Sequence, residues 1–406
     1  MNKFPGTSVG PTNAATANPA TTRVALLTEI IAPYRIPVFN ALARQKGIDL
    51  HVIFLAETDP AQRQWRVYKD EIEFSYEVLP AWRWRWGGWQ VLLNRRLWAA
   101  LDGFRPRSIL CGGYNHPAFW QAQAWAKFHA THFAAWIEST RQDRRQHNLL
   151  AEFSKRQFIR NCNTFAVPGK SSTEYLNSMG VSSERIHTAP NAVDIRRFAN
   201  LARAAKEQAA QRRAELGLPS RYFLYAGRII PEKGVFHLLQ AYIQLPSELR
   251  SRMGLVFVGD GPAKAELRAE LMTESITSAA KVVPGTVLFP GFAQRDQLAG
   301  FYALAEVLVF PTLSDPWGLV VNEAMACGLP IIATDVAGCT ADLVRDGENG
   351  FVIPSANVGS LTEAMAAFAR DPQLASRMGE RSATLIETFS PESCAAGLAK
   401  ASVPTP

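Results

Sequence analysis

The 406-residue sequence lacks the features that define several protein classes. Its apolar runs, such as Val307-Leu-Val-Phe310, are far shorter than the roughly 20 residues of a membrane-spanning helix. Residues 1–22 have no apolar stretch of the kind found in a signal peptide, and we expect them to form a flexible tail. The five cysteines are an odd, scattered set without metal-ligand spacing. This pattern predicts reduced thiols in a cytoplasmic protein.

Positive charge is unevenly distributed along the chain. Residues 1–200 carry 25 Lys and Arg against 15 Asp and Glu, whereas residues 201–406 carry 18 against 21. A basic half favours an anionic partner, such as a nucleic acid, a phospholipid surface or a phosphorylated substrate. The sequence has no paired Cys/His ligands and no aromatic RNA-binding pattern, so we expect no nucleic-acid partner.

Apolar segments of strand length alternate with helical segments in two series. The first series runs from Val24–Thr28 to Thr164–Val167, and the second from Tyr222–Tyr225 to Phe351–Ile353. Such alternation predicts parallel sheets covered by helices, and therefore an α/β fold with two doubly wound halves. Ligands of these sheets bind beyond the carboxyl ends of the strands, so two facing halves imply a cleft between them.

The expected domain limits lie where this alternation stops and restarts. We expect a first domain over residues 23–195 and a second domain over residues 219–385. Residues 196–218 are expected to form a charged helical linker without a strong apolar stripe. The C-terminal segment, residues 386–406, lies outside the second domain and can cross back to the first.

A glycine-containing segment, Ala226-Gly-Arg-Ile-Ile-Pro-Glu-Lys-Gly234, joins a predicted strand to an amphipathic helix. Arg228 and Lys233 flank this loop at the start of the helix. Fixed positive charge, free N–H groups and the positive end of a helix dipole are what a diphosphate group requires. The alternative is a solvated loop with two incidental cations.

A second motif, Asp315-Pro-Trp-Gly-Leu-Val-Val-Asn-Glu323, follows the predicted strand Val307–Phe310. We expect a helix to start near Pro316 and to carry Glu323 about two turns along, so that Asp315 and Glu323 meet different ends of one ligand. A helix cap and a solvated helix face are the structural alternatives. A carboxylate among apolar neighbours is costly without partners, which favours a role for Glu323.

Together, the Gly-Arg-x-x-Pro-Glu-Lys-Gly segment and the acidic-x7-Glu segment resemble the signature of retaining nucleotide-sugar glycosyltransferases of family 4. The resemblance is close over roughly residues 185–390 and looser in the first half. There it depends on four segments, Ala32–Pro37, Gly112–Pro117, Trp136–Ser139 and Pro190–Asp194. It implies the GT-B fold, with two facing Rossmann-like domains, and a UDP- or GDP-sugar as donor.

The resemblance also implies roles for individual residues. Arg228 and Lys233 would hold the donor diphosphate, and Glu323 would accept hydrogen bonds from the ribose hydroxyls. The transferred sugar would bind Asp315 and the N–H groups of Gly318, Leu319 and Val320. Family members usually have Glu where this chain has Asp315, which leaves the sugar open. Because cations take the place of a metal and no Asp-x-Asp pair is present, no cofactor and no divalent metal ion are implied.

Two residues of the first half are candidates for catalytic positions. His116 follows a Gly-Gly turn after the predicted strand Ser108–Cys111, and in similar enzymes a histidine in this region contacts the donor sugar. Glu138 ends another predicted strand and is a candidate to face the reacting carbon. The alternatives are a structural role for His116 in its loop, and a buried salt bridge of Glu138 with Arg141 or Arg144.

Tryptophan and arginine alternate over Ala81–Trp89. Indole side chains favour the bilayer interface and guanidinium groups favour phosphates, which predicts contact with a membrane or a lipid-linked acceptor. The residues expected at this acceptor or membrane contact are Tyr34, Arg35, Trp82, Arg83, Trp84, Arg85 and Trp86. The alternative is an edge strand with one face in the core and its arginines in water.

These features predict a cytoplasmic enzyme that can attach to the cytoplasmic face of the membrane. It would transfer a sugar, with retention, from a nucleoside diphosphate to a hydroxyl group of a lipid-linked saccharide in surface-glycan biosynthesis. The alternatives are a nucleotide-sugar epimerase with the same fold and a sugar-nucleotide-binding protein without catalytic activity. Starch- and glycogen-type synthases share the motifs, but the first domain lacks the Lys-x-Gly-Gly opening of that group.

Overall fold

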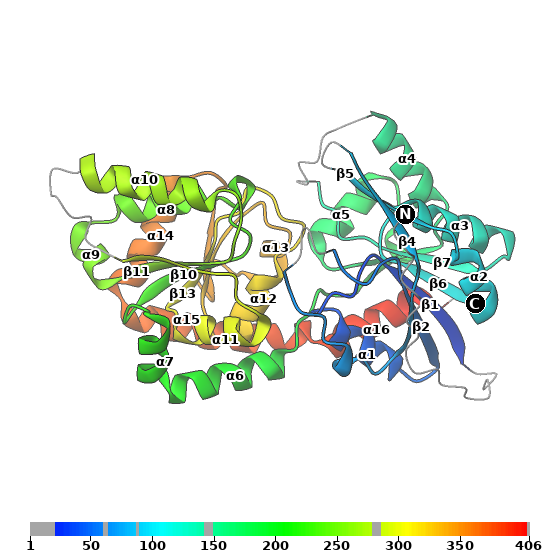
Figure 1. The fold of residues 1–406 in the computed structure, drawn as a ribbon, viewed down its shortest axis with the longest axis horizontal. Coiled ribbons are helices and arrows are strands. Elements are labelled where there is room, and N and C mark those ends of the chain that lie inside the picture. Colours follow the sequence, from blue (N-terminus) through cyan, green and yellow to red (C-terminus); the bar gives the residue numbers. More distant parts are fainter. Residues whose placement is uncertain (1–20, 60–63, 87–88, 142–148, 278–285, 404–406) are drawn as a thin grey trace. The chain divides into compact units, whose positions relative to one another are not determined.

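A computed structural model describes residues 21–59, 64–86, 89–141, 149–277 and 286–403. The chain forms two compact units, each built around a parallel sheet (Figure 1). The first unit consists of residues 1–193 and 390–406, and the second of residues 194–389. The predicted α/β class, with two doubly wound sheets, is confirmed.

The first sheet has seven parallel strands in the order β3-β2-β1-β6-β7-β8-β9. The strands are β1 (Thr22–Thr28), β2 (Ile48–Phe54), β3 (Ser75–Val78), β6 (Ser108–Cys111), β7 (His132–Trp136), β8 (Thr164–Val167) and β9 (Ile186–Thr188). The helices of this unit are α1 (Ile36–Ala43), α2 (Leu97–Phe104), α3 (Pro117–Phe128), α4 (Leu149–Arg160), α5 (Lys170–Ser178) and α16 (Pro391–Ser402). Ala25 and Leu27 of β1 belong to one buried cluster, and Val24 and Leu26 to another. Successive residues thus face opposite sides of the sheet, and both sides are covered.

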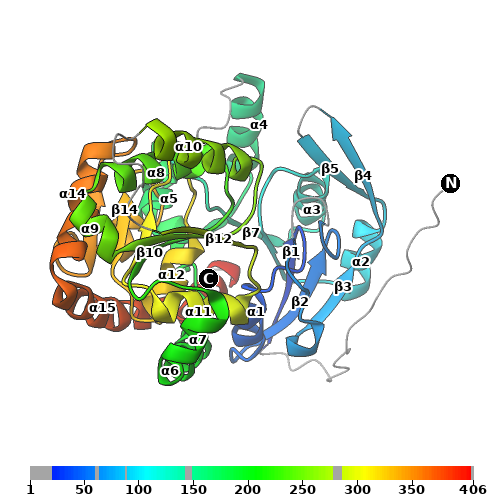
Figure 2. The ribbon, with the colours of Figure 1, turned by 60° about the vertical axis from the view of Figure 1, so that its left-hand side comes forward.

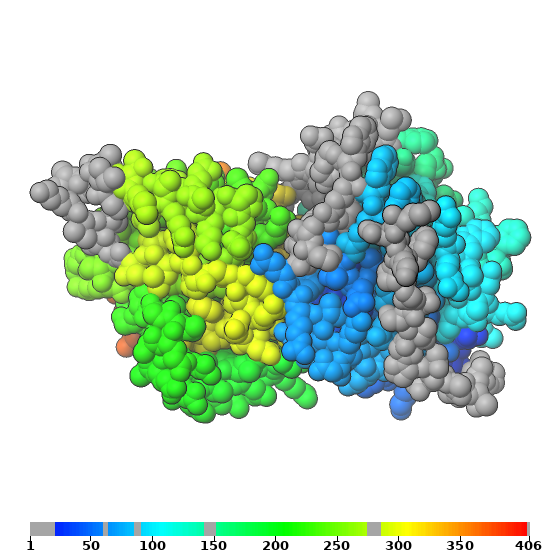
Figure 3. All heavy atoms as spheres, in the orientation of Figure 1, coloured from blue at the N-terminus to red at the C-terminus, as the bar shows by residue number. Residues whose placement is uncertain are grey.

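Two further strands, β4 (Ala81–Trp86) and β5 (Trp89–Asn94), pair only with each other, in an antiparallel arrangement. The register places Trp82 opposite Leu93 and Trp84 opposite Val91. Figure 2 shows these strands as a hairpin that extends from the first sheet, and the space-filling view shows the hairpin at the surface of its unit (Figure 3). The segment is therefore not an edge strand of the main sheet.

The second sheet has six parallel strands in the order β12-β11-β10-β13-β14-β15. The strands are β10 (Tyr222–Ala226), β11 (Gly254–Val258), β12 (Val287–Gly291), β13 (Val307–Phe310), β14 (Ile331–Thr334) and β15 (Gly350–Ile353). The helices are α6 (Ile195–Glu207), α7 (Ala209–Leu216), α8 (Val235–Gln244), α9 (Ser247–Arg252), α10 (Lys264–Thr277), α11 (Arg295–Leu304), α12 (Leu319–Ala326), α13 (Thr340–Leu343), α14 (Val358–Arg370) and α15 (Pro372–Ile386). In both sheets the strand order reverses beside the first strand of the unit. The switch points of the two sheets, where ligands of doubly wound folds bind, are therefore β1/β6 and β10/β13.

The segment expected to be a linker, residues 196–218, belongs to the second unit. Its first helix, α6, packs against α11 and α12. Phe198, Ala202 and Ala205 are buried at intervals of four and three residues, which is the spacing of one helix face. The sequence alone does not predict a strong apolar stripe on this helix, because two of these three residues are alanines and alanine is only weakly apolar.

The C-terminal helix α16 belongs to the first unit, next to α1 (Figure 1). Ser390 caps the helix by accepting a hydrogen bond from the N–H of Ser393. Cys394, Leu398 and Ala401 form its buried face and join the cluster that includes β1. The Thr164 hydroxyl also donates a hydrogen bond to the carbonyl oxygen of Ala401, at 2.6 Å.

Two sequence-based expectations concern the cysteines and membrane spans. All five cysteines are buried free thiols. Within the described parts of the chain, no helix combines the length and apolar character that crossing a bilayer requires.

A substitution at Gly397 tests the docking of α16. A Cβ atom at this position would lie 2.1 Å from the carbonyl oxygen of Thr188, so Gly397→Ala forces the helix away from β9. We expect a loss of about 1–3 kcal/mol of stability, seen as a lower melting temperature in calorimetry. The matched control is Gly103→Ala in α2, where a Cβ atom has no neighbour within 4 Å. That change should be neutral or stabilising by about 0.5–1 kcal/mol, and an equal effect of both would contradict the tight contact.

Candidate functional site

The two sequence motifs of the second unit lie at its topological switch point. The loop Gly227–Gly234 follows the carboxyl end of β10 and leads into α8. The loop Pro311–Gly318 follows the carboxyl end of β13 and leads into α12. Because β10 and β13 are neighbours in the sheet, both loops extend from the same edge.

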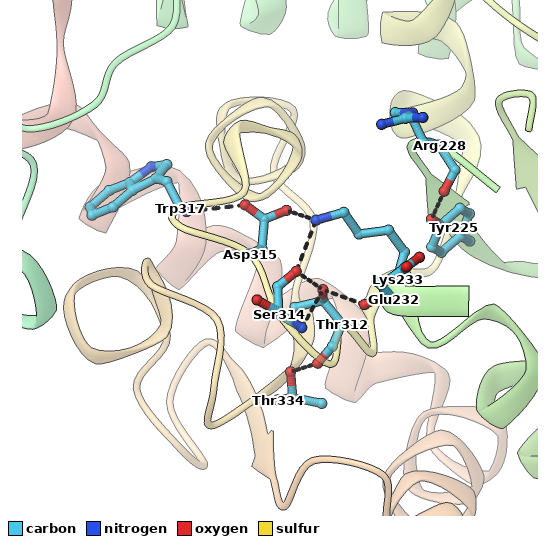
Figure 4. Close-up of polar contacts among 9 residues, drawn as sticks. All are labelled: Tyr225, Arg228, Glu232, Lys233, Thr312, Ser314, Asp315, Trp317 and Thr334. Atoms are coloured by element: carbon cyan, nitrogen blue, oxygen red, sulfur yellow. Dashed lines mark hydrogen bonds and ion pairs between the residues drawn. The ribbon is translucent and has the colours of Figure 1, made fainter. Parts of the chain in front are cut away.

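Lys233 and Asp315 join these two loops (Figure 4). The Lys233 ammonium donates a hydrogen bond to Asp315 Oδ2 at 2.6 Å and another to the carbonyl oxygen of Ser314 at 3.0 Å. Both side chains are about one-fifth exposed, so the ion pair is accessible from solvent. The structure thus brings together a cation and a carboxylate that the sequence separates by 82 residues.

Asp315 is held by its own loop as well as by Lys233. Its Oδ1 accepts a hydrogen bond from the backbone N–H of Trp317 at 3.0 Å. Its carbonyl oxygen accepts one from the N–H of Gly338, also at 3.0 Å. The carboxylate therefore has a fixed position beside the start of α12.

The helix α12 begins at Leu319, so the expected start near Pro316 is wrong by one turn. Gly318 precedes the helix with a φ of 99°, in the left-handed region. A Cβ atom there would lie 2.5 Å from the Phe310 ring, so only glycine fits. The N–H groups of Gly318, Leu319 and Val320 are at the helix start, where backbone donors have no intrahelical partner.

Glu323 lies about one turn into α12 and not two, because the helix starts later than expected. Its Oε2 accepts a hydrogen bond from the Tyr302 hydroxyl of α11 at 2.8 Å. Burial raises the pKa of Glu323 to about 7, although this hydrogen bond and the nearby Arg295 both act to lower it. Glu323 is therefore not a solvated residue on an outer helix face.

Arg228 completes the set of residues predicted for the second unit. Its side chain is exposed, while its backbone carbonyl accepts a hydrogen bond from the Tyr225 hydroxyl at 2.6 Å. This bond holds the backbone of the loop, while the guanidinium points away from Tyr225 (Figure 4). Two cations and a helix start on one sheet edge can bind a diphosphate group.

In the first unit, His116 lies at the β1/β6 switch point, at the start of α3. Its side chain is only 2% exposed. The backbone N–H of Leu92 in β5 donates to Nδ1 at 3.5 Å, and Nε2 is 3.5 Å from Glu29 Oε1. A ring with an accepting Nδ1 carries its proton on Nε2, facing the Glu29 carboxylate.

Glu138 lies just beyond β7 and forms an ion pair with Arg35, at 3.0 Å from Nη2. The partner is thus Arg35 and not Arg141, one of the two expected alternatives, while the other, Arg144, lies outside the described residues. The Arg35 guanidinium also stacks over the Trp136 ring, 4.0 Å from its centroid. Burial acts to lower the pKa of Arg35, but Glu138 raises it and the net pKa is above the usual value.

The described side chains of the hairpin point the opposite way from the edge-strand alternative, in which the arginines would lie in water. Trp82 and Trp84 are 68% and 57% exposed. Arg83 points to the other face, where its Nη1 is 3.1 Å from the buried Asp59. Arg83 is therefore not available for a surface phosphate, and the side chains of Arg85 and Trp86 lie outside the described residues. Tyr34 packs edge-on against Trp65, with ring centroids 5.9 Å apart.

Sequence comparisons cover most of both units. Residues 38–197 match the family described as Glycosyltransferase Family 4, and residues 207–384 match the family described as Glycosyl transferases group 1. The chain belongs to the family 4 glycosyltransferases. The second match spans the loops Gly227–Gly234 and Pro311–Gly318, which agrees with the resemblance seen in the sequence.

Two of the curated relatives are D-inositol 3-phosphate glycosyltransferases. The D-inositol 3-phosphate glycosyltransferase of Streptomyces scabiei is 28% identical over 337 residues, which are 80% of this chain and 71% of that protein. The protein of the same name from Streptomyces bingchenggensis is 34% identical over 231 residues, 56% of this chain and 49% of that protein. The chain spans about half the length of several curated relatives that it matches.

A solved structure of Anabaena HepE, in complex with UDP and glucose, superposes with a TM-score of 0.69 at 16% identity. The superposition covers 93% of this chain and 98% of that one. At this identity the likeness shows the fold alone, which is GT-B.

Sequence reasoning missed two residues of these sites. Glu29 directly follows β1, so the strand-end rule that selected His116 and Glu138 could have found it. Tyr302 had no such signal, because it lies in the apolar part of a helix and its partner is 21 residues away in another helix.

A substitution at Gly234 tests how closely the loops Gly227–Gly234 and Pro311–Gly318 must approach each other. Its φ is 69°, and a Cβ atom would lie 1.9 Å from the carbonyl oxygen of Pro311. Gly234→Ala should therefore cost about 2–5 kcal/mol, the sum of left-handed strain and the clash. The control, Gly347→Ala, has a similar φ of 75° but no neighbour within 4 Å, and should cost only about 1–2 kcal/mol. Equal losses in calorimetry would show that the loops tolerate separation.

Proposed function

We propose that this glycosyltransferase binds a nucleoside diphosphate sugar at the β10/β13 switch point and transfers the sugar to a saccharide hydroxyl. The observation that carries the proposal is the Lys233–Asp315 pair, 2.6 Å apart beside the start of α12. A cation and a carboxylate at this edge suit a ligand that has a diphosphate and a sugar in sequence. Arg228, exposed in the same loop as Lys233, adds a second positive charge.

When the donor binds, Lys233 exchanges its ion-pair partner Asp315 for the diphosphate group. A diphosphate carries more negative charge than the Asp315 carboxylate, so the ammonium group turns toward it. Asp315 is then free to accept hydrogen bonds from sugar hydroxyls, while its Oδ1 stays anchored to the Trp317 N–H. As the bond to the sugar breaks, negative charge grows on the diphosphate, and Lys233 and Arg228 stabilise it. This mechanism requires no cofactor and no divalent metal ion, and it accepts a UDP- or a GDP-sugar.

The transfer is proposed to retain the configuration at the anomeric carbon. The bond from this carbon to the diphosphate oxygen breaks, and the bond to the acceptor oxygen forms on the same face. The departing diphosphate oxygen takes the acceptor's proton, so the protein needs no strong general base. His116 and Glu138, at the carboxyl ends of β6 and β7, then serve to position groups and not to transfer protons.

The proposed acceptor is a lipid-linked saccharide of a surface glycan. The supporting features are the excess of positive charge over residues 1–200 and the exposed Trp82 and Trp84. Relatives named as D-inositol 3-phosphate glycosyltransferases favour a phosphorylated inositol as the second candidate. A panel containing both acceptor classes distinguishes them by turnover.

We also propose that the hairpin docks on the anionic cytoplasmic face of a membrane. Trp82 and Trp84 supply the amphipathic rings that favour the interface. The positive charge comes from Arg95 and Arg96, which follow β5 and are both exposed. Arg83 serves the hairpin instead, through its ion pair with Asp59.

Replacement of the donor cations tests the transfer reaction. Loss of one charge-assisted contact should cost about 1.5–3 kcal/mol, so Lys233→Ala and Arg228→Ala should bind nucleoside diphosphates ten- to a hundredfold more weakly. Turnover should fall further, because the charge on the leaving group grows in the transition state. Calorimetric titration and a turnover assay measure the two effects, and NMR of the new anomeric linkage reports its configuration.

The matched control for the donor cations is Arg252→Ala, which removes an exposed arginine from α9 in the same unit. This variant should bind and turn over as the parent protein does. Unchanged nucleotide affinity in both loop variants would refute the donor assignment, and an inverted linkage would refute retention.

Membrane docking is tested by vesicle flotation. We expect binding to vesicles that contain phosphatidylglycerol, decreasing with salt, because each cation near the surface contributes about 1 kcal/mol. Replacing Trp82 and Trp84 by serine, or Arg95 and Arg96 by glutamine, should release the protein. Phe128→Ser is the control, since it removes an aromatic side chain that is 78% exposed on α3. Flotation that is indifferent to lipid charge would rule out the proposed surface.

A further inference from the structure

One carboxylate oxygen of Glu323 already accepts a hydrogen bond from inside the protein. Tyr302 donates a hydrogen bond to its Oε2 at 2.8 Å, and Tyr302 itself is 0% exposed. Glu323 retains partial exposure although α12 is packed on α6, α11 and α15. One side of this carboxylate is thus held in the core, while the residue as a whole still reaches the surface.

The Tyr302 ring has a fixed place between helices. It belongs to the buried face of α11, and its ring contacts the Phe198 ring of α6 edge-on, with centroids 6.4 Å apart. A tyrosine hydroxyl has a single proton to donate, and here it goes to Glu323. The hydrogen bond from Tyr302 therefore restrains the rotation of the Glu323 carboxylate as well as its distance from α11.

We propose that Tyr302 is a positioning residue of the donor site, because it holds Oε2 of Glu323 and leaves Oε1 to accept hydrogen bonds from the ribose hydroxyls. This inference rests on the proposed function, which places the ribose of the donor nucleotide at Glu323. No contact between Tyr302 and the nucleotide is needed. Its effect passes through the geometry and the charge of one carboxylate.

The groups that act directly on this carboxylate belong to one helix, α11. Tyr302 and Arg295 of α11 both favour its charged form. Cys327 directly follows the last residue of α12, one turn beyond Glu323, and the Lys206 ammonium of α6 acts on its thiol. The arginines of α15, Arg377 and Arg381, pair with Asp371 and Glu348 instead.

The proposal predicts how nucleotide binding depends on pH. Burial raises the pKa of Glu323 to about 7, and the Tyr302 hydrogen bond opposes this rise. A protonated carboxyl is a weaker acceptor, so affinity should decrease as the pH falls through about 7. Without the hydroxyl the pKa rises further, and the same decrease should begin at a higher pH.

The experiment measures the affinity of UDP and GDP for the full chain by calorimetric titration across about pH 6 to 9. We expect Tyr302→Phe to bind the nucleotide about three- to tenfold more weakly at neutral pH and to shift the pH midpoint upward. Tyr242→Phe is the matched control, because it removes a buried hydroxyl that donates to the carbonyl oxygen of Met253 in the same unit. Its affinity and pH profile should equal those of the parent.

A 2′,3′-dideoxynucleoside diphosphate serves as the second probe. It keeps the phosphates but lacks the ribose hydroxyls, so its affinity should be the same for the parent and for Tyr302→Phe at every pH. A double variant provides a third check, since Tyr302→Phe should cost nothing further once Glu323→Ala has removed the carboxylate that it positions. This check compares folded proteins whose melting temperatures are measured in parallel.

The outcomes separate the two proposals. If the parent binds UDP or GDP and Tyr302→Phe leaves the pH profile unchanged, the positioning role is wrong while the donor site stands. The positioning role is also wrong if Tyr302→Phe weakens the dideoxy probe equally, because the effect is then structural. If the parent binds neither nucleotide, the proposed function fails and the inference fails with it.

Discussion

The proposed donor site depends on a direct backbone contact between two loops of one sheet edge. The carbonyl oxygen of Glu232 accepts hydrogen bonds from the N–H of Leu313 at 2.9 Å and from the Thr312 hydroxyl at 3.3 Å. The Thr334 hydroxyl of β14 donates a hydrogen bond to the carbonyl oxygen of Thr312 and so anchors the second loop to the sheet. These contacts set the distance at which a side chain of one loop meets a side chain of the other. The functional groups are thus positioned by main-chain packing, which a substitution at Lys233 or Asp315 would leave in place.

Local features of the sequence were sufficient to predict most strands of the two parallel sheets and the loop cations. Apolar runs separated by helical segments indicate parallel strands, and a parallel sheet has its loops on one edge. Arg228 and Lys233 lie in a strand-loop-helix segment, so their placement follows from that order alone. The exact start of α12 was not predictable in this way, because the loop after Asp315 contains a glycine in the left-handed region.

Contacts between distant segments account for what the sequence did not reveal. Arg35 precedes Glu138 by 103 residues, so nearer arginines were the obvious partners for that carboxylate. Asp59 pairs with Arg83 on the inner face and the tryptophans lie outside, which is the reverse of the edge-strand alternative. The buried face of α6 was missed for another reason, since alanine is small and common on exposed helices too. In each case the prediction requires knowledge of which residue lies across the contact in the folded chain. Hydrophobic patterning does not provide this knowledge.

The return of α16 to the first unit has a consequence for biosynthesis. The first sheet is complete once β9 has been made, but Cys394, Leu398 and Ala401 cover one of its faces only after the whole second unit has been translated. During that interval the apolar residues beneath α16 are open to water or to chaperones. The nascent first unit, which leaves the ribosome first, therefore keeps an uncovered apolar surface until the last helix has been made.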